Sequence, residues 1–236
     1  MEQGKPIEYV RGFTEFLGCK IDLSKKPLIP RRETEFWVEK AIKKISHNLQ
    51  SFGKCSIGVL DIFSGSGCIG IAILKNIKNS EVVFADKDKK CLEQIKINLR
   101  INIPSYKLHG REVCRTVQSD VFEGLTLQKL KHLGGQGFDY IFANPPYVAE
   151  LMRHKVQKSV LDSEPKSALF GGKDGLFYIK KFLKGAGGHL NSGGRIFMEF
   201  SPEQKKEIKK FIEKYNYKTY EFHKDQYGRW RWVVIG

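Results

Sequence analysis

Four consecutive residues, Asn144-Pro145-Pro146-Tyr147, have the types and order that suit chemistry on a planar NH₂ group. The two prolines fix φ, lack N–H donors and hold the preceding residues in extended conformations. The Asn144 side-chain oxygen and the Pro145 carbonyl oxygen are therefore rigid acceptors for the two N–H bonds of an amide or amino group. Such positioning directs the nitrogen lone pair towards a methyl donor without a charged base, and Tyr147 offers a flat face. A rigid turn that closes a strand is the alternative interpretation.

A glycine-rich segment, Asp61-Ile-Phe-Ser-Gly65-Ser-Gly67-Cys-Ile-Gly70, lies between an expected strand and an expected helix. Glycines at such a turn let the backbone approach a ligand closely. Asp86 ends the next expected strand, about twenty residues on, where a carboxylate can accept both hydroxyls of a ribose. Asp61 suits a cofactor that carries an amino group and a sulfonium. Plain turn chemistry for the glycines and a helix cap at Asp86 remain open.

Phosphate-binding interpretations of this turn fit less well. The segment has no Gly-Lys-Ser/Thr, which excludes a P-loop, and Phe63 occupies the first glycine position of the dinucleotide-binding pattern.

The elements that must position these residues alternate between short β-like runs and longer helical runs, as in doubly wound α/β proteins. Expected strands cover 56–62, 81–85, 112–118, 138–143, 194–200, 217–222 and 229–235, and expected helices cover 33–46, 68–76, 87–99, 174–185 and 202–215. Seven strands, the last two directly consecutive, predict the Rossmann-like class I methyltransferase fold: a mostly parallel sheet with an antiparallel last strand and helices on both faces. The long polar stretch 144–173 is expected to be a functional loop, and the first thirty residues stay unassigned.

Composition excludes several classes of protein. Hydrophobic residues make up 41% and charged residues 28%, which is ordinary for a globular chain. No apolar run approaches the ~20 residues that cross a bilayer, and the first residues lack the apolar core of a secretion signal. The five cysteines form no Cys-x-x-Cys pair, so we expect a reduced, cytoplasmic protein without a metal site. The net charge of +15 suggests proximity to nucleic acid or the ribosome, although lysines spread along solvated helices explain it equally.

Beyond these features, the sequence resembles the HemK family, the glutamine methyltransferases of peptide chain release factors. The resemblance covers roughly Tyr9 to the C-terminus. Besides Asn144–Tyr147, it rests on four segments: Leu28-Ile-Pro-Arg-Arg-Glu-Thr-Glu35, Leu60-Asp-Ile-Phe-Ser-Gly-Ser-Gly-Cys-Ile, Glu164-Pro-Lys-Ser-Ala-Leu-Phe-Gly-Gly-Lys-Asp-Gly175 and Lys224-Asp-Gln-Tyr-Gly-Arg-Trp-Arg. Together they are far more specific than either motif alone.

The resemblance implies an S-adenosylmethionine-dependent enzyme whose partner is a release factor, and we expect a monomer that does not bind membranes. Its cofactor would be held by Phe63, Ser64, Gly65, Ser66, Gly67, Asp86, Asp120, Val121 and Asn144. The substrate glutamine would be held by Asn144, Pro145, Pro146 and Tyr147, which are also the catalytic set, with Arg31, Glu33 and Thr34 near the mouth. For the last three residues, a helix N-cap is an equal alternative.

The chain departs from the family in two ways. Phe63 replaces the first glycine of the turn, and bacterial members usually carry an N-terminal helical domain. Residues 1–27 are expected to stand in place of that domain, and 28–236 to form the catalytic domain. Gly134-Gly135-Gln136 spells the tripeptide that the family modifies, but no release-factor domain surrounds it, so we regard it as coincidence.

Two other functions remain as hypotheses. An Asn-Pro-Pro-Tyr segment can also grip the exocyclic amine of adenine in DNA or RNA, which would require base flipping on a duplex. No separate target-recognition domain is evident for that activity. A non-catalytic nucleic-acid-binding protein on a degenerate scaffold is the third hypothesis, and the intact Asp86 and Asn144 argue against it.

Overall fold

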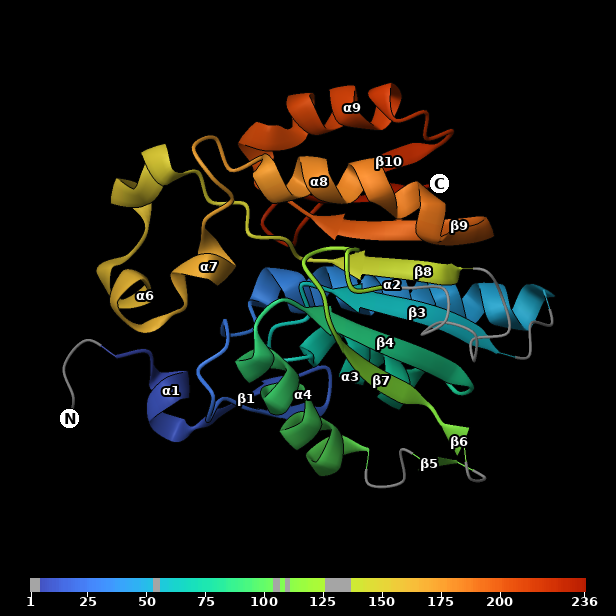
Figure 1. Cartoon of the computed structure of the whole chain (residues 1–236), viewed down its shortest axis with the longest axis horizontal. Coiled ribbons are helices and arrows are strands. Elements are labelled where there is room, and N and C mark those ends of the chain that lie inside the picture. The colour runs from blue at the N-terminus through green and yellow to red at the C-terminus, as the bar shows by residue number, and fades with distance from the viewer. Residues whose placement is uncertain (1–4, 53–55, 104–106, 109–110, 126–136) are drawn as a thin grey trace.

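A seven-stranded sheet organises the chain (Figure 1). The computed structural model describes residues 5–52, 56–103, 107–108, 111–125 and 137–236. The tripeptide 134–136 lies outside these residues. The sheet has the order β10-β11-β9-β8-β3-β4-β7. Its strands are β3 (Ile57–Ile62), β4 (Ser80–Asp86), β7 (Cys114–Gln118), β8 (Phe138–Ala143), β9 (Leu190–Glu199), β10 (Tyr220–Lys224) and β11 (Trp230–Ile235).

Strand directions confirm the predicted class I fold. β11 runs antiparallel to β9 and β10, and every other adjacent pair in this sheet is parallel. The chain moves from β3 outward to β4 and β7, and then returns to place β8 on the other side of β3. Loops that leave the carboxyl ends of two such strands diverge, and a crevice opens between them.

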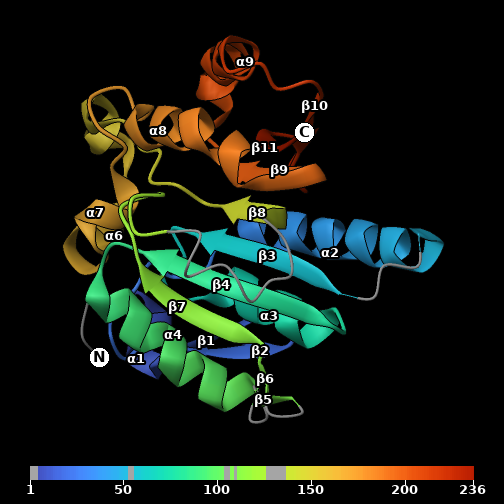
Figure 2. The ribbon, with the colours of Figure 1, turned by 45° about the vertical axis from the view of Figure 1, so that its right-hand side comes forward.

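Side chains alternate across each strand, so the two faces of the sheet build two hydrophobic clusters. In β3, Val59 belongs to one cluster and Leu60 to the other. The first cluster is covered by α2 (Arg32–Phe52), α3 (Cys68–Asn76) and α4 (Lys89–Asn102), and the second by α8 (Phe177–Ala186) and α9 (Lys205–Lys214). Figure 2 shows α8 and α9 across the sheet from α3 and α4, which confirms helices on both faces.

The N-terminal residues, which had no sequence pattern, form α1 (Ile7–Arg11) and a hairpin of β1 (Phe13–Phe16) and β2 (Cys19–Asp22). Phe16, Cys19 and Ile21 are buried in the same cluster as α2 and α3. A second small hairpin joins β5 (Lys107–Leu108) to β6 (Arg111–Glu112).

Amide side chains on α4 attach the first hairpin to the sheet. Gln94, Asn98 and Asn102 lie four residues apart and therefore share one helix face. Their oxygens accept backbone N–H bonds at 2.8–2.9 Å: Asn98 from Asp22, Asn102 from Lys20 and Gln94 from Lys25. The Asn98 Nδ2 also donates to the Ser66 carbonyl at 2.9 Å, which connects the hairpin to the glycine turn.

The expectation of a loop over 144–173 is wrong in part, because this stretch contains helices. It contains η2 (Glu150–Lys155), α6 (Lys158–Ser163) and α7 (Lys166–Leu169), each too short for a clear helical period. The expected strand 112–118 begins only at Cys114, because Glu112 belongs to β6. Two other short helices are η3 (Gly187–His189) and η4 (Pro202–Gln204). Ser201 caps the latter in a capping box with Gln204.

The part of the chain that the structure describes lacks both a membrane-spanning helix and a cluster of metal-binding side chains. No helix there is long and apolar enough to span a membrane, and no group of three or more His, Cys, Asp or Glu side chains there could hold a metal ion.

Gly70 sets the distance between α3 and the sheet. A Cβ at this position would overlap the ring of Phe84. We expect Gly70→Ala to destabilise the protein by about 1–3 kcal/mol, because the helix must move or the ring must leave its rotamer. Urea unfolding measures this. Gly188→Ala is the control, because a Cβ there meets nothing within 4 Å; equal stability of the two variants would contradict the packing role.

Candidate active site

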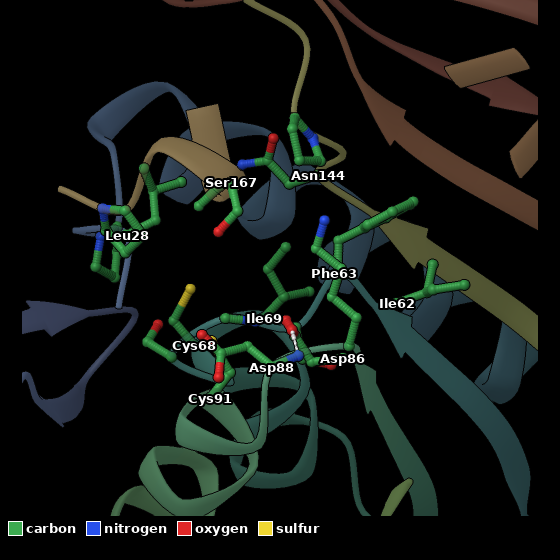
Figure 3. Close-up of a pocket in the computed structure, with 18 of the residues that line it drawn as sticks. Leu28, Ile62, Phe63, Cys68, Ile69, Asp86, Asp88, Cys91, Asn144 and Ser167 are labelled. Atoms are coloured by element: carbon green, nitrogen blue, oxygen red, sulfur yellow. Dashed lines mark hydrogen bonds between the residues drawn. The ribbon is translucent and has the colours of Figure 1, made fainter. Parts of the chain in front are cut away.

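The first pocket opens at the carboxyl ends of β3, β4 and β8, where the topology predicts a crevice. We call it the turn pocket. The residues that line it include Phe63, Ser64, Gly65, Ser66, Asp86 and Asn144. Figure 3 shows Asn144 and Ser167 on one side of the cavity, with Cys68, Asp86 and Asp88 on the other. The two sequence motifs therefore face each other across one cavity.

The glycine turn has three residues with positive φ: Phe63 at 59°, Gly65 at 54° and Gly67 at 78°. A Cβ on Gly65 would have the Phe63 carbonyl oxygen as its nearest neighbour, at 4.0 Å, so there is open space beside this glycine. Phe63 adopts a left-handed backbone conformation, which costs a residue other than glycine about 1–2 kcal/mol. Its ring packs edge-on against Tyr178, at 5.9 Å between centroids, and against Phe182, at 6.2 Å. Aromatic packing thus holds the turn where the family has a glycine.

Asp86 fastens the turn to the loop after β4. Its Oδ2 accepts from the Gly65 N–H and its Oδ1 from the Asp88 N–H, both at 2.9 Å. Burial raises the pKa of Asp86, and these two backbone donors oppose that shift. The helix-cap interpretation of Asp86 is wrong, because Asp88 is the N-cap of α4 and accepts from the Lys90 N–H. Each Asp86 oxygen keeps a lone pair for a further donor.

Asp61 lies directly beneath the turn. Its Oδ2 accepts from the Gly70 N–H at 3.0 Å, whereas its Oδ1 is buried and has no hydrogen-bond partner in the described structure. Burial raises the pKa of Asp61 well above its usual value. An unpaired buried polar atom is costly. Asp61 lines neither pocket, so the fit to a nucleoside cofactor rests on the open backbone at Gly65 and on the Asp86 carboxylate.

A second pocket adjoins the first. We call it the loop pocket, because α6, α7 and the two residues after η2 line it together with the Asn-Pro-Pro-Tyr segment. Pro145 and Tyr147 line only this pocket, and Pro146 lines only the turn pocket. Four residues line both: Leu28, Arg31, Asn144 and Ala168. Asn144 therefore stands at the boundary between the two cavities.

Two glycines of the Gly171–Gly175 loop press directly on the Asn-Pro-Pro-Tyr backbone. A Cβ on Gly171 would overlap the Pro146 carbonyl, and one on Gly175 would overlap the Tyr147 carbonyl. The Gly171 N–H donates to the Val148 carbonyl at 2.9 Å, which continues this contact. Steric contact therefore explains why glycine occupies positions 171 and 175 of the Gly-Gly-Lys-Asp-Gly sequence. The loop fixes where the Pro146 and Tyr147 carbonyls lie.

The Pro145 carbonyl differs from its neighbours. The Tyr147 carbonyl accepts from Gln204 Nε2 at 2.9 Å. No donor within the described part of the chain reaches the Pro145 carbonyl oxygen. One acceptor next to Asn144 is therefore unused.

A buried carboxylate that sequence patterns missed lines the loop pocket together with Asn144. Glu199, 1% exposed, ends β9. Its Oε2 accepts from Thr34 Oγ1 at 2.6 Å and from Trp37 Nε1 at 2.7 Å, and its Oε1 accepts from the Tyr147 hydroxyl at 3.0 Å. Burial raises the pKa of Glu199, and the bonds from Thr34 and Trp37 oppose that shift. Its only sequence signal is its place at the end of the strand that follows β8.

Most predicted site residues line one of the two pockets. Val121 and Thr34 line the turn pocket, and Arg31 lines both. Gly67, Asp120 and Glu33 line neither pocket. The Asp120 Oδ2 accepts instead from Lys181 Nζ at 2.8 Å. Thr34 bonds to Glu199, so the N-cap interpretation does not describe its hydroxyl.

Residues that the sequence did not single out also line the turn pocket. They are side chains from α3, α4, α7, α8 and the loops after β4 and β7: Cys68, Lys87, Asp88, Cys91, Ser119, Ser167 and Tyr178. Burial raises the pKa of Cys91 above its usual range, so its thiol is neutral. Cys68 and Ser167 belong to motif segments. The others belong to none, and only the fold brings them to the pocket.

The sheet order and the crevice define the class: this is a class I methyltransferase. The crystal structure of ribosomal protein L11 methylase from Lactobacillus delbrueckii subsp. bulgaricus matches with a TM-score of 0.58, over 90% of this chain and 82% of that one, at 15% identity. At that identity the match shows the fold alone. The class implies that S-adenosylmethionine is the cofactor.

Sequence relatives give the family. The release factor glutamine methyltransferase of Flavobacterium psychrophilum is 34% identical over all of this chain and 76% of its own length. That of Clostridium botulinum is 33% identical over 95% of this chain and 73% of its own length. A family model described as "Conserved hypothetical protein 95" also matches residues 38–180. The chain belongs to the release factor glutamine methyltransferase family, and the predicted family is confirmed.

An ion pair closes one side of both pockets. Arg31 Nη2 donates to Glu164 Oε1 at 2.6 Å, and the Glu164 side chain is fully buried. Removing one partner of a buried pair costs about 3–5 kcal/mol, because the other charge is left unpaired. We therefore expect Arg31→Met to destabilise the protein more than the double variant Arg31→Met/Glu164→Gln. Urea unfolding of both variants measures the difference; a double variant that is the less stable would contradict this.

Proposed function

We propose that this enzyme transfers a methyl group from S-adenosylmethionine to the side-chain amide nitrogen of a glutamine, the one in the Gly-Gly-Gln motif of a peptide chain release factor. The names of its relatives support the substrate. The observation that carries the mechanism is the position of Asn144, which lines both the turn pocket and the loop pocket. A group held there reaches both a cofactor and a protein side chain.

The turn pocket suits the cofactor. We assign its binding to Phe63–Gly67, Asp86, Asp120, Val121 and Asn144, with Asp86 on the ribose hydroxyls. Asp120 would act from the rim, because its carboxylate is paired with Lys181. When bound, the cofactor supplies an electrophilic methyl group on a sulfonium.

The loop pocket suits the glutamine. We propose that the Asn144 Oδ1 and the Pro145 carbonyl accept the two N–H bonds of its amide, so that the nitrogen lone pair points towards the turn pocket. Tyr147 would pack on the amide plane, and Pro146 would hold the backbone rigid. Positioning and hydrogen bonding of this kind require no charged base at the nitrogen. Arg31, Glu33 and Thr34 would lie near the mouth, although Glu33 lines neither pocket.

The remaining assignments follow from this function. We propose that 28–236 form the catalytic domain, with the hairpin of β1 and β2 packed into its core. The enzyme would work as a monomer in the cytoplasm, and its net charge of +15 suits a partner that functions on the ribosome. Methylation of adenine is the less favoured hypothesis, because the relatives are named for glutamine.

Asn144→Ala tests the transfer mechanism. We expect it to abolish methyl transfer while the cofactor Kd changes by less than about threefold, because the variant loses one of two acceptors that orient the amide. Radiolabelled S-adenosylmethionine is incubated with a release factor or with nucleic acid, and the label is located by mass spectrometry. Label on glutamine supports the proposal, whereas label on adenine would replace it. Unchanged turnover in Asn144→Ala would exclude the mechanism.

Asp86→Ala tests the ribose assignment. A hydrogen bond to a charged group contributes about 1.5–3 kcal/mol, so the cofactor Kd should rise by roughly ten- to a hundredfold. Asp120→Ala is the matched variant, and its rise should be smaller because the Asp120 side chain is 46% exposed and paired with Lys181. Calorimetric titration measures both. A normal Kd for Asp86→Ala in a folded protein would remove Asp86 from the cofactor site.

A further inference from the structure

The orientation of the Asn144 amide is set by residues behind it. We infer that Trp37, Glu199 and Thr34 form a hydrogen-bond relay of fixed direction, in which Thr34 is the positioning residue that turns the Asn144 carbonyl oxygen towards the methyl acceptor. The inference rests on the proposed function for its substrate. The relay itself is a property of the protein without ligand.

The direction of the relay begins at Trp37. An indole N–H only donates. Trp37 Nε1 lies 2.7 Å from Glu199 Oε2, so this oxygen acts as an acceptor. Thr34 Oγ1 lies 2.6 Å from the same oxygen. With Glu199 ionised, Oε2 carries no proton, so the Thr34 hydroxyl donates to it as well.

The next link fixes the amide. A hydroxyl has one proton, and that of Thr34 is directed at Glu199. Thr34 Oγ1 can then only accept from Asn144, whose Nδ2 lies 3.4 Å away. The amide nitrogen of Asn144 faces Thr34, and the Oδ1 stays available as an acceptor. An amide turned the other way would present N–H donors to the N–H bonds of a substrate amide and repel them.

The burial of the relay makes its direction stable. Thr34 is 2% exposed, Trp37 is fully buried, and Glu199 is 1% exposed. An unpaired polar group at such a buried position would cost about 1–3 kcal/mol. The Tyr147 hydroxyl donates to the same carboxylate. Glu199 therefore positions both the ring of Tyr147 and, through Thr34, the amide of Asn144.

Thr34→Val and Thr34→Ser separate the hydroxyl from the shape of the side chain. Valine keeps the shape and removes the relay, so kcat should fall by about a hundredfold, as for a misplaced catalytic group. Serine keeps the hydroxyl, so its kcat should stay within about threefold of the unmodified enzyme. The cofactor Kd should change by less than about twofold in both. Thr14→Val in β1 is the matched control, because Thr14 lines neither pocket.

Glu199→Gln separates direction from charge. A glutamine can turn its oxygen towards Trp37 and Thr34 and its NH₂ towards the Tyr147 hydroxyl, which preserves the direction of the relay. It should lose less kcat than Thr34→Val. An equal loss in Glu199→Gln would show that the negative charge matters rather than the direction, and would overturn the inference, as would normal kcat in Thr34→Val or an equal loss in Thr34→Ser.

A measurement without substrate keeps this inference separate from the proposed function. In ¹⁵N-labelled protein, the Asn144 NH₂ signals are identified by their absence in Asn144→Ala. We expect them to be ordered in the unmodified protein and in Thr34→Ser, and shifted or broadened in Thr34→Val. Unchanged signals in Thr34→Val would overturn the relay. Ordered signals with no methylation of a release factor would instead refute only the proposed function.

Discussion

The buried Glu199 carboxylate connects the parts of the chain on which the active site depends. It receives donors from two residues of α2 and from the tyrosine of the Asn-Pro-Pro-Tyr segment, while its own backbone ends β9. A carboxylate removed from water is stable only when donors surround it. The three donors therefore stabilise Glu199, and Glu199 in turn holds α2 and the segment after β8 in one arrangement.

Sequence reasoning succeeded where the pattern was local. The bounds of α3 and β8 match those expected, because each is a mostly apolar run with a glycine directly before it. The glycine turn and the Asn-Pro-Pro-Tyr segment were placed correctly at the carboxyl ends of strands, since parallel strands bring those ends to one edge. The family followed from short motifs that the relatives share.

It failed where the information lies in three-dimensional contacts. The bond from Thr34 to Glu199 spans 165 positions, and no local pattern can report it. Asp86 and Asp88 are both acidic residues after a strand, and only the backbone shows that Asp88 caps α4. The short helices of 144–173 have too few turns to show a period, so they read as a loop. Asp120 follows β7 as expected, yet its pairing with Lys181 depends on the packing of α8.

The turn pocket is fastened on its two sides by bonds of different chemistry. On the α4 side, three side-chain amides join the helix to the hairpin and to the residues after it, and one of them, that of Gln94, also donates to the Asp22 carboxylate. On the opposite side, Arg31 pairs with Glu164, whose side chain is fully buried. Salt screens a buried pair much less than an exposed one. Loss of either partner, rather than added salt, would therefore release this wall of the cavity.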